Sequence, residues 1–104
     1  IRYAVMEVEG DMKAMMTMLG ELTRDHSKPT LAVLGTRDGG GQIIVASTEG
    51  THAAEIHNAA EILNSISVHI DGGGGGSPTM AQGGGSNSDG IPGALESARQ
   101  LLGL

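Results

Sequence analysis

The residues best placed to do chemistry lie in one glycine-rich segment, residues 71–91, which holds half of the chain's glycines. Five consecutive glycines, Gly72–Gly76, offer no side chain to bury, and glycine loses more backbone freedom on folding than any other residue. The segment is therefore either a flexible linker or an ordered loop whose backbone approaches another surface closely. Met80, Ala81 and Gln82, which separate two glycine runs, favour the ordered loop because a Gly/Ser linker has no use for them.

A backbone without side chains is suited to binding. Successive N–H groups can form a concavity that receives an anion. A bare ledge can also lie flat against a base pair or a ribose. Polar neighbours could add hydrogen bonds to phosphates, 2′-hydroxyls or base edges. These neighbours are Ser77, Thr79, Gln82, Ser86 and Asn87.

Arrangements typical of catalysis are missing. The glycines are not followed by the Lys-Ser/Thr pair of a P-loop. His52 and His57 are five residues apart, which is not the i, i+4 spacing of a zinc-binding helix. His69 and Asp71 flank the glycines without a nucleophile beside them, which favours a structural role. The chain has no cysteine, which excludes disulfides and thiolate metal sites. We expect no catalytic residue, no metal and no cofactor in this domain.

The net charge of −6 is unfavourable for gripping nucleic acid through phosphates. The basic residues are Arg2, Lys13, Arg24, Lys28, Arg37 and Arg99. Stacking is nearly unavailable because Tyr3 is the only aromatic residue. An RNA contact would therefore be local and driven by shape, with Arg37 and Lys28 as candidate phosphate partners. No apolar run could span a bilayer, and we expect a cytoplasmic protein without membrane contact.

Periodicity predicts the elements that must position the glycines. Strands are expected at 1–8, 30–36 and 42–48, a short strand or extended segment at 65–70, and helices at 12–22, 51–63 and 92–102. The fold class is α/β, with helices packed on a small mixed β-sheet and a long glycine-rich loop, 71–91, before the final helix. Residues 1–104 form a single domain. Because the chain begins at Ile1, we expect it to be the C-terminal fragment of a longer protein.

The run Gly-Gly-Gly-Gly-Ser-Pro-Thr-Met-Ala-Gln-Gly-Gly-Gly, at Gly73–Gly85, resembles the signature of the DHH-associated domain that ends alanyl-tRNA synthetases, most closely the archaeal type. The resemblance covers the whole chain in element order, but its specificity is concentrated in residues 72–85. A glycine run alone would be a weak signal, whereas a run that encloses Ser-Pro-x-Met-Ala-Gln is a strong one.

This resemblance implies a non-catalytic domain that binds alanine-specific tRNA at its outer corner, where the D and T loops meet, and so supports aminoacylation and editing. The parent enzyme would use ATP and Mg, with Zn in its editing domain, and would form a homodimer through an upstream helical region. The expected contact residues are Gly73, Gly74, Gly75, Gly76, Ser77, Pro78, Gln82, Gly83, Gly84 and Gly85, with Arg37 and Lys28 beside them.

Two other functions stay open. One is the substrate-binding half of a DHH-type phosphoesterase acting on short oligonucleotides. In those relatives a histidine follows the glycine run and helps to hold substrate, and Ser77 stands at that position here. The other is a dimerisation module whose glycines allow close approach of strands or subunits.

Overall fold

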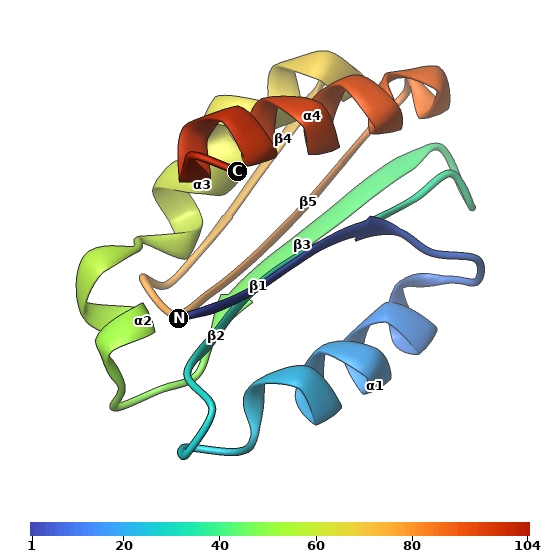
Figure 1. Cartoon of the computed structure of the whole chain (residues 1–104). Helices are drawn as coiled ribbons and strands as arrows, with labels where there is room; N and C mark the ends of the chain where they lie inside the picture. The colour runs from blue at the N-terminus through green and yellow to red at the C-terminus, as the bar shows by residue number, and fades with distance from the viewer.

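A computed structural model describes all 104 residues. Its five-stranded mixed sheet has the order β1-β2-β3-β5-β4 (Figure 1). The strands are β1 (Arg2–Glu7), β2 (Thr30–Thr36), β3 (Gly41–Ser47), β4 (Gly72–Gly76) and β5 (Met80–Gly85). β1 and β2 are parallel, and every other neighbouring pair is antiparallel. The predicted α/β fold class, with helices on a small mixed sheet, is confirmed.

Helices cover the two faces of the sheet unequally (Figure 1). On one face α1 (Met12–Thr23) packs over β2 and β3. The other face carries α3 (Ala59–Ile66), which lies over β3, β4 and β5, and α4 (Ile91–Leu102), which lies over β1 and β2. A short helix, α2 (His52–Ile56), precedes α3. Because α1 stops short of β4 and β5, one face of these two strands has no helix over it.

The central strands separate two cores because successive side chains point to opposite faces. Leu31 and Val33 of β2 join the core beneath α3 and α4, while Ala32 and Leu34 join the smaller core beneath α1. All of β2 is buried, as expected of a strand covered on both faces. Met15 supplies a fully buried side chain on the α1 side.

The prediction of a strand at 65–70 is wrong. These residues form the end of α3 and a 3-10 turn, η1 (Ser67–Ile70). Asn58 caps α3, since its side chain accepts a hydrogen bond from the Glu61 N–H. Ile66 and Ile70, four residues apart, are both buried, whereas Val68 between them is 67% exposed. Helical spacing therefore explains the apolar residues better than alternation does.

The predicted single helix at 51–63 is also interrupted. His57 has extended backbone angles and separates α2 from α3, and the Asn58 cap begins the second helix. The break leaves Ile56 exposed instead of on a buried stripe. No helix of the protein has the length and apolar character that crossing a bilayer would need.

The glycine-rich segment is ordered, but it is a β-hairpin and not a loop. β4 forms the sheet edge, and β5 pairs with both β4 and β3. Ala81, which is 2% exposed, anchors β5 in the core beneath α3. A short 3-10 turn, η2 (Ser88–Gly90), leads into α4.

Candidate nucleic-acid interface

A groove runs between α1 and the open face of the hairpin. Three adjoining hollows of about 370, 410 and 300 Å³ make it up, and they share lining residues. We call it the hairpin groove. Its α1 wall is Met12, Met16, Gly20 and Thr23, and its floor is Gly73–Gly76 with Met80–Gly85. It follows α1 along its whole length, from Met12 at one end to Thr23 at the other.

The glycines of β4 are of two kinds. A Cβ added to Gly72, Gly74 or Gly76 would collide with carbonyl oxygens of β5, so the strand pairing itself requires glycine there. A Cβ added to Gly73 or Gly75 would meet no atom within 4 Å. By register Gly73 and Gly75 lie opposite Gly84 and Gln82, on the face that forms the groove floor.

Gly20 is an unexpected glycine in the interior of α1. A Cβ there would also meet no atom within 4 Å. Glycine costs a helix interior about 1 kcal/mol relative to alanine, so this residue destabilises α1 without a packing reason. Gly20 lines the end of the hairpin groove nearest the hairpin turn, together with Thr79 and Met80.

Only two other glycines have such free space, Gly50 and Gly103, and both have positive φ, 72° and 76°. That backbone conformation favours glycine whatever the space. The three glycines with an empty Cβ position and no positive φ are therefore Gly20, Gly73 and Gly75, and all three line the hairpin groove. Space kept free on both sides of one groove indicates a ligand that approaches the backbone closely.

The hairpin turn is held rigid by its own polar groups. Ser77 Oγ accepts hydrogen bonds from the backbone N–H of Thr79 and of Met80. The Pro78 carbonyl accepts the Ala59 N–H at 2.8 Å, which ties the turn to the start of α3. Ser77 and Pro78, both predicted as contact residues, thus shape the turn, and the Ser77 hydroxyl is already engaged.

Two glutamine side chains are available in the groove. Gln82 is exposed on β5 and lines two of the three hollows. Gln42 lies beside Gly84 on β3, and its Oε1 is buried without a hydrogen-bond partner. A buried acceptor without a partner is costly, so Gln42 is a strained feature beneath the groove floor, whereas the Gln82 amide is open to a ligand.

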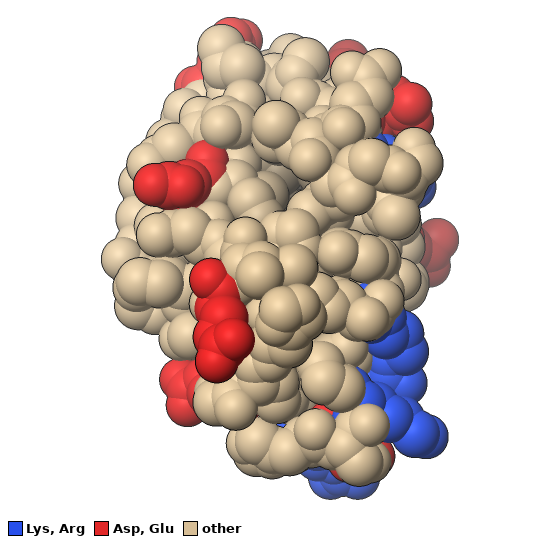
Figure 2. Space-filling view, turned by 60° about the vertical axis from the view of Figure 1, so that its left-hand side comes forward, with Lys and Arg blue, Asp and Glu red and all other residues tan.

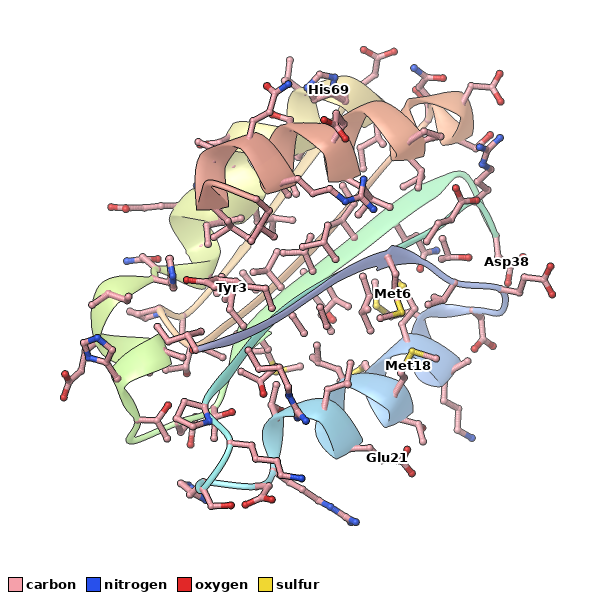
Figure 3. All side chains as sticks on the ribbon, in the orientation of Figure 1. Tyr3, Met6, Met18, Glu21, Asp38 and His69 are labelled. Atoms are coloured by element: carbon pink, nitrogen blue, oxygen red, sulfur yellow. The ribbon has the colours of Figure 1, made fainter.

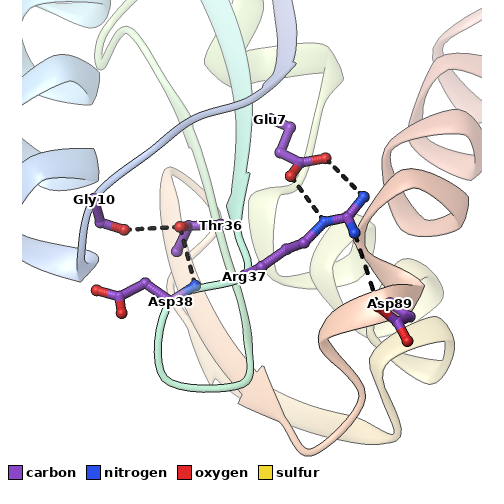
Figure 4. Close-up of polar contacts among 6 residues, drawn as sticks. All are labelled: Glu7, Gly10, Thr36, Arg37, Asp38 and Asp89. Atoms are coloured by element: carbon purple, nitrogen blue, oxygen red, sulfur yellow. Dashed lines mark hydrogen bonds and ion pairs between the residues drawn. The ribbon is translucent and has the colours of Figure 1, made fainter.

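The basic residues divide into engaged and free groups. Arg37 pairs with Glu7 at 2.9 Å and with Asp89 at 3.8 Å (Figure 4), and Arg99 pairs with Glu96. Arg2 donates to the Leu22 carbonyl and to Thr30 Oγ1. The remaining three, which have no ion pair or side-chain hydrogen bond, are Lys13, Arg24 and Lys28.

All three free cations lie on α1 or the loop after it. At 100° per residue, Lys13 and Arg24 project in nearly the same direction around the helix axis as Gly20, which lines the groove. Glu21 faces away from the sheet (Figure 3). Figure 2 shows Lys and Arg gathered at the lower right of a face on which carboxylates are otherwise scattered.

Two titratable groups have shifted pKa values, and neither lines the groove. Hydrogen bonds from the Ser27 hydroxyl and N–H lower the pKa of Asp25, with Lys28 and Arg2 adding to the effect. Partial burial, with a smaller contribution from His52, lowers the pKa of His57. The His57 ring Nε2 lies 2.9 Å from the Tyr3 hydroxyl, on the α3 side of the sheet (Figure 3).

The structure brings together most of the predicted contact residues. The glycines of 73–76 and 83–85 and Gln82 lie along the floor. Lys28 lies in the loop before β2, at the same end of the sheet as the hairpin turn. Arg37 follows β2 at the opposite end, where its charge is neutralised. The two predicted cations therefore do not form one site.

The α1 wall of the groove was not predicted from the sequence. The lining residues that the sequence did not single out are Met12, Met16, Gly20, Arg24 and Gln42. One signal was available: a glycine inside an amphipathic helix, here Gly20, usually has a packing or functional reason. The remaining members lie thirty or more residues from the hairpin in sequence, and only the fold places them beside it.

The sequence model of the DHHA1 domain matches residues 1–104. An alanine–tRNA ligase of Roseiflexus sp. strain RS-1 is 36% identical over 103 residues, 98% of this chain and 11% of that protein. The alanine–tRNA ligase of Methanothrix thermoacetophila is 38% identical over 80 residues, 77% of this chain and 9% of that protein.

The fold has a solved counterpart, the C-Ala domain of Aquifex aeolicus alanyl-tRNA synthetase. Its TM-score is 0.69 at 24% identity, and the match covers 97% of this chain and 88% of that one. The chain spans about a tenth of the length of the alanine–tRNA ligases that it resembles. Because the family model matches it from end to end, the chain belongs to the DHHA1 domain family.

Proposed function

We propose that this domain is the tRNA-binding C-terminal domain of an alanine–tRNA ligase, with the hairpin groove as its contact surface and no catalytic step of its own. The observation that carries the proposal is the placement of Gly20, Gly73 and Gly75. Their Cβ positions are empty, their backbone does not require glycine, and they face one groove. The similarity to alanine–tRNA ligases along nearly the whole chain supports the same assignment.

The groove suits a nucleic acid that is recognised by shape. A ribose or base pair can lie flat on the floor at Gly73 and Gly75, where no side chain stands in the way. The Gln82 amide can donate to and accept from base edges or 2′-hydroxyls. Between Lys13 and Arg24 the helix advances about 16 Å at 1.5 Å per residue, the length of about five stacked bases.

Electrostatics sets how strongly the isolated domain binds. Three free cations, Lys13, Arg24 and Lys28, can each neutralise a phosphate, whereas the net charge of −6 opposes association. We expect a shallow dependence on salt, with log Kd rising against log salt with a slope of about 2 to 3 for three phosphates. Affinity would therefore be weak and would come largely from contacts to the groove floor.

A fluorescence anisotropy titration against alanine-specific tRNA tests the proposal. The competitor is the same tRNA with the base pair at its outer corner disrupted. We expect tighter binding to the intact tRNA and weaker binding by Gly75→Val. A Gln100→Ala variant, changed at an exposed position on α4 behind the sheet, is the control and should bind like the wild type. Equal, negligible binding to both tRNAs would count against the proposal.

A dimerisation module is the second candidate, because one observation favours it. β4 is an edge strand, exposed along its whole length, and its outer backbone groups are free to pair with another strand. Light scattering separates the two functions: a stable dimer that is indifferent to tRNA would support this candidate. The phosphoesterase alternative is less well supported, since Ser77 replaces the substrate-holding histidine and its hydroxyl is engaged in the turn.

The proposed parent enzyme implies a location, an oligomeric state and a set of cofactors. It would act in the cytoplasm, form a homodimer through an upstream helical region, and use ATP and Mg for aminoacylation, with Zn in its editing domain. Aminoacylation and editing assays on the parent, comparing wild type with Gly75→Val, would test whether the groove supports both reactions. A variant that charged and edited at wild-type rates at limiting tRNA would contradict this role.

A further inference from the structure

The end of the hairpin groove nearest the hairpin turn is a distinct hollow of about 370 Å³, which we call the turn-end hollow. Its volume lies within the range of sites that hold small molecules, so it can accept a single nucleobase with its ribose. Its lining comes from α1 and the loop after it, from the end of β3 and the turn that follows, and from the start of β5.

The walls of the turn-end hollow are apolar, and their side chains are partly exposed. Met16 extends from α1 and is 44% exposed, and Met80 extends from β5 on the other side and is 37% exposed. Leu19 and Ala46 close the back. Thioether groups pack favourably against aromatic rings, and no aromatic residue of the chain lines this hollow. The empty Cβ position of Gly20 widens the opening between the walls.

The rim of the hollow carries one carboxylate whose position is fixed. Glu49 Oε1 accepts a hydrogen bond from Thr79 Oγ1 at 3.2 Å. Thr79 Oγ1 in turn lies 3.3 Å from Ser77 Oγ, within the rigid turn. Glu49 has no basic side chain within ion-pair distance, and its second carboxylate oxygen has no hydrogen-bond partner. It is therefore an oriented acceptor at the edge of an apolar slot.

We propose that the turn-end hollow binds one unpaired guanine of the RNA, a proposal that rests on the function proposed above. Guanine alone presents two adjacent donors, N1–H and N2–H, on its Watson–Crick edge, and they match the two acceptor oxygens of Glu49. Adenine, cytosine and uracil each place an acceptor beside their donor, which repels the second oxygen. The guanine ring lies between Met16 and Met80.

Arg24 completes the site. It lines the hollow, has no carboxylate partner, and can neutralise the phosphate attached to the bound nucleotide. This cation offsets the repulsion between the Glu49 carboxylate and the RNA backbone. Base and phosphate are thus recognised by residues from opposite walls, which fixes the direction in which a strand enters the hairpin groove.

NMR titration of the 104-residue chain tests the guanine site, with GMP, IMP and AMP as probes. IMP differs from GMP by the missing 2-amino group alone. We expect shifts in the amide signals of Gly20, Glu49 and Thr79, and binding of GMP about fivefold or more tighter than IMP, since a hydrogen bond to a charged group is lost. Equal affinity for the two nucleotides would overturn the proposal.

The matched variants are Glu49→Gln and Glu55→Gln, which remove the same charge at the rim and on α2. Glu49→Gln should abolish the preference for GMP over IMP, because its amide NH2 opposes a guanine donor, while Glu55→Gln should keep it. Retention of the preference in Glu49→Gln would overturn the proposal. If tRNA binding remains sensitive to Gly75→Val without any guanine preference, the guanine site alone fails; if tRNA does not bind at all, the proposed function fails.

Discussion

Alanine substitutions along β4 would separate the glycines that the sheet requires from those that a ligand requires. In Gly74→Ala the new Cβ would lie 2.5 Å from the Gly83 Cα and against the Gln82 carbonyl. β4 would have to shift, at a cost of about 1–3 kcal/mol as for other overpacked sites. For a domain of this size that lowers Tm by roughly 4 to 24 °C.

Gly75→Ala should do the opposite to stability. Its Cβ meets no atom within 4 Å, and the alanine reduces the conformational freedom of the unfolded chain. We expect a gain of about 0.4–1 kcal/mol, or a rise in Tm of roughly 2 to 8 °C. The same methyl group stands on the groove floor, and keeping a ribose or base from the backbone should cost about 1–3 kcal/mol of tRNA binding, about 5- to 150-fold in Kd.

Thermal unfolding followed by circular dichroism, together with anisotropy titrations against tRNA, measures both effects on the same samples. Gln100→Ala controls for a surface change on the opposite face. The reasoning predicts that Gly75→Ala is more stable and binds more weakly, whereas Gly74→Ala is less stable. It would be refuted if Gly75→Ala bound tRNA like the wild type, or if the two variants lost similar stability.

Three further predictions rest on other parts of the molecule. Gly20→Ala should stabilise the protein by about 1 kcal/mol through helix propensity and still weaken tRNA binding; an unchanged Kd would contradict a role in the groove. Lys13→Gln should reduce the slope of log Kd against log salt by about 0.7–0.9, while Arg37→Gln, whose charge is paired, should leave the slope unchanged in the same titrations. Folding lowers the pKa of His57. Near and below the ordinary histidine value of 6.5 the unfolded chain therefore binds more protons than the folded protein, which lowers the free energy of unfolding as pH falls. The urea concentration at the unfolding midpoint should therefore decrease as pH is lowered from 7 to 5, and it should decrease less in His57→Gln. An equal decrease in the two proteins would contradict a lowered pKa at His57.

The sequence predicts the central elements well because their patterns are strong. The apolar centre of residues 42–48 indicates a strand buried on both faces, and β3 is buried at every residue but Gln42. The stripe through Met15 and Leu19 fixes the buried side of α1. These signals are local, so a single sequence is enough to recognise them.

The hairpin could not be predicted in the same way. Glycine has little tendency to form strands, and β4 contains no other residue. Its strand conformation comes from pairing with β5, which is itself held by β3 and by one buried side chain, Ala81. The error at 65–70 has a related cause, because Ile66 and Ile70 fit both alternation and a helical turn, and packing decides between them.

Only one side of the candidate site, the glycine floor, could be predicted from the sequence. The glycine floor and Gln82 are contiguous, and their bare backbone points to close approach. The opposite wall depends on α1 lying beside the hairpin without covering it, which no local pattern encodes. The same is true of charge: Arg37 and Lys28 look alike in sequence, but in the fold only Lys28 keeps a free ammonium group.

Glycine amide signals offer the most direct measurement of the central claim, that tRNA lies on the bare backbone of the hairpin groove. In a heteronuclear NMR spectrum of the labelled chain, added tRNA should broaden or shift the amides of Gly20, Gly73 and Gly75. Gly103, which has an equally open Cβ position but owes its glycine to positive φ, should not change. Changes confined to α3 and α4, with the groove glycines unaffected, would contradict the account.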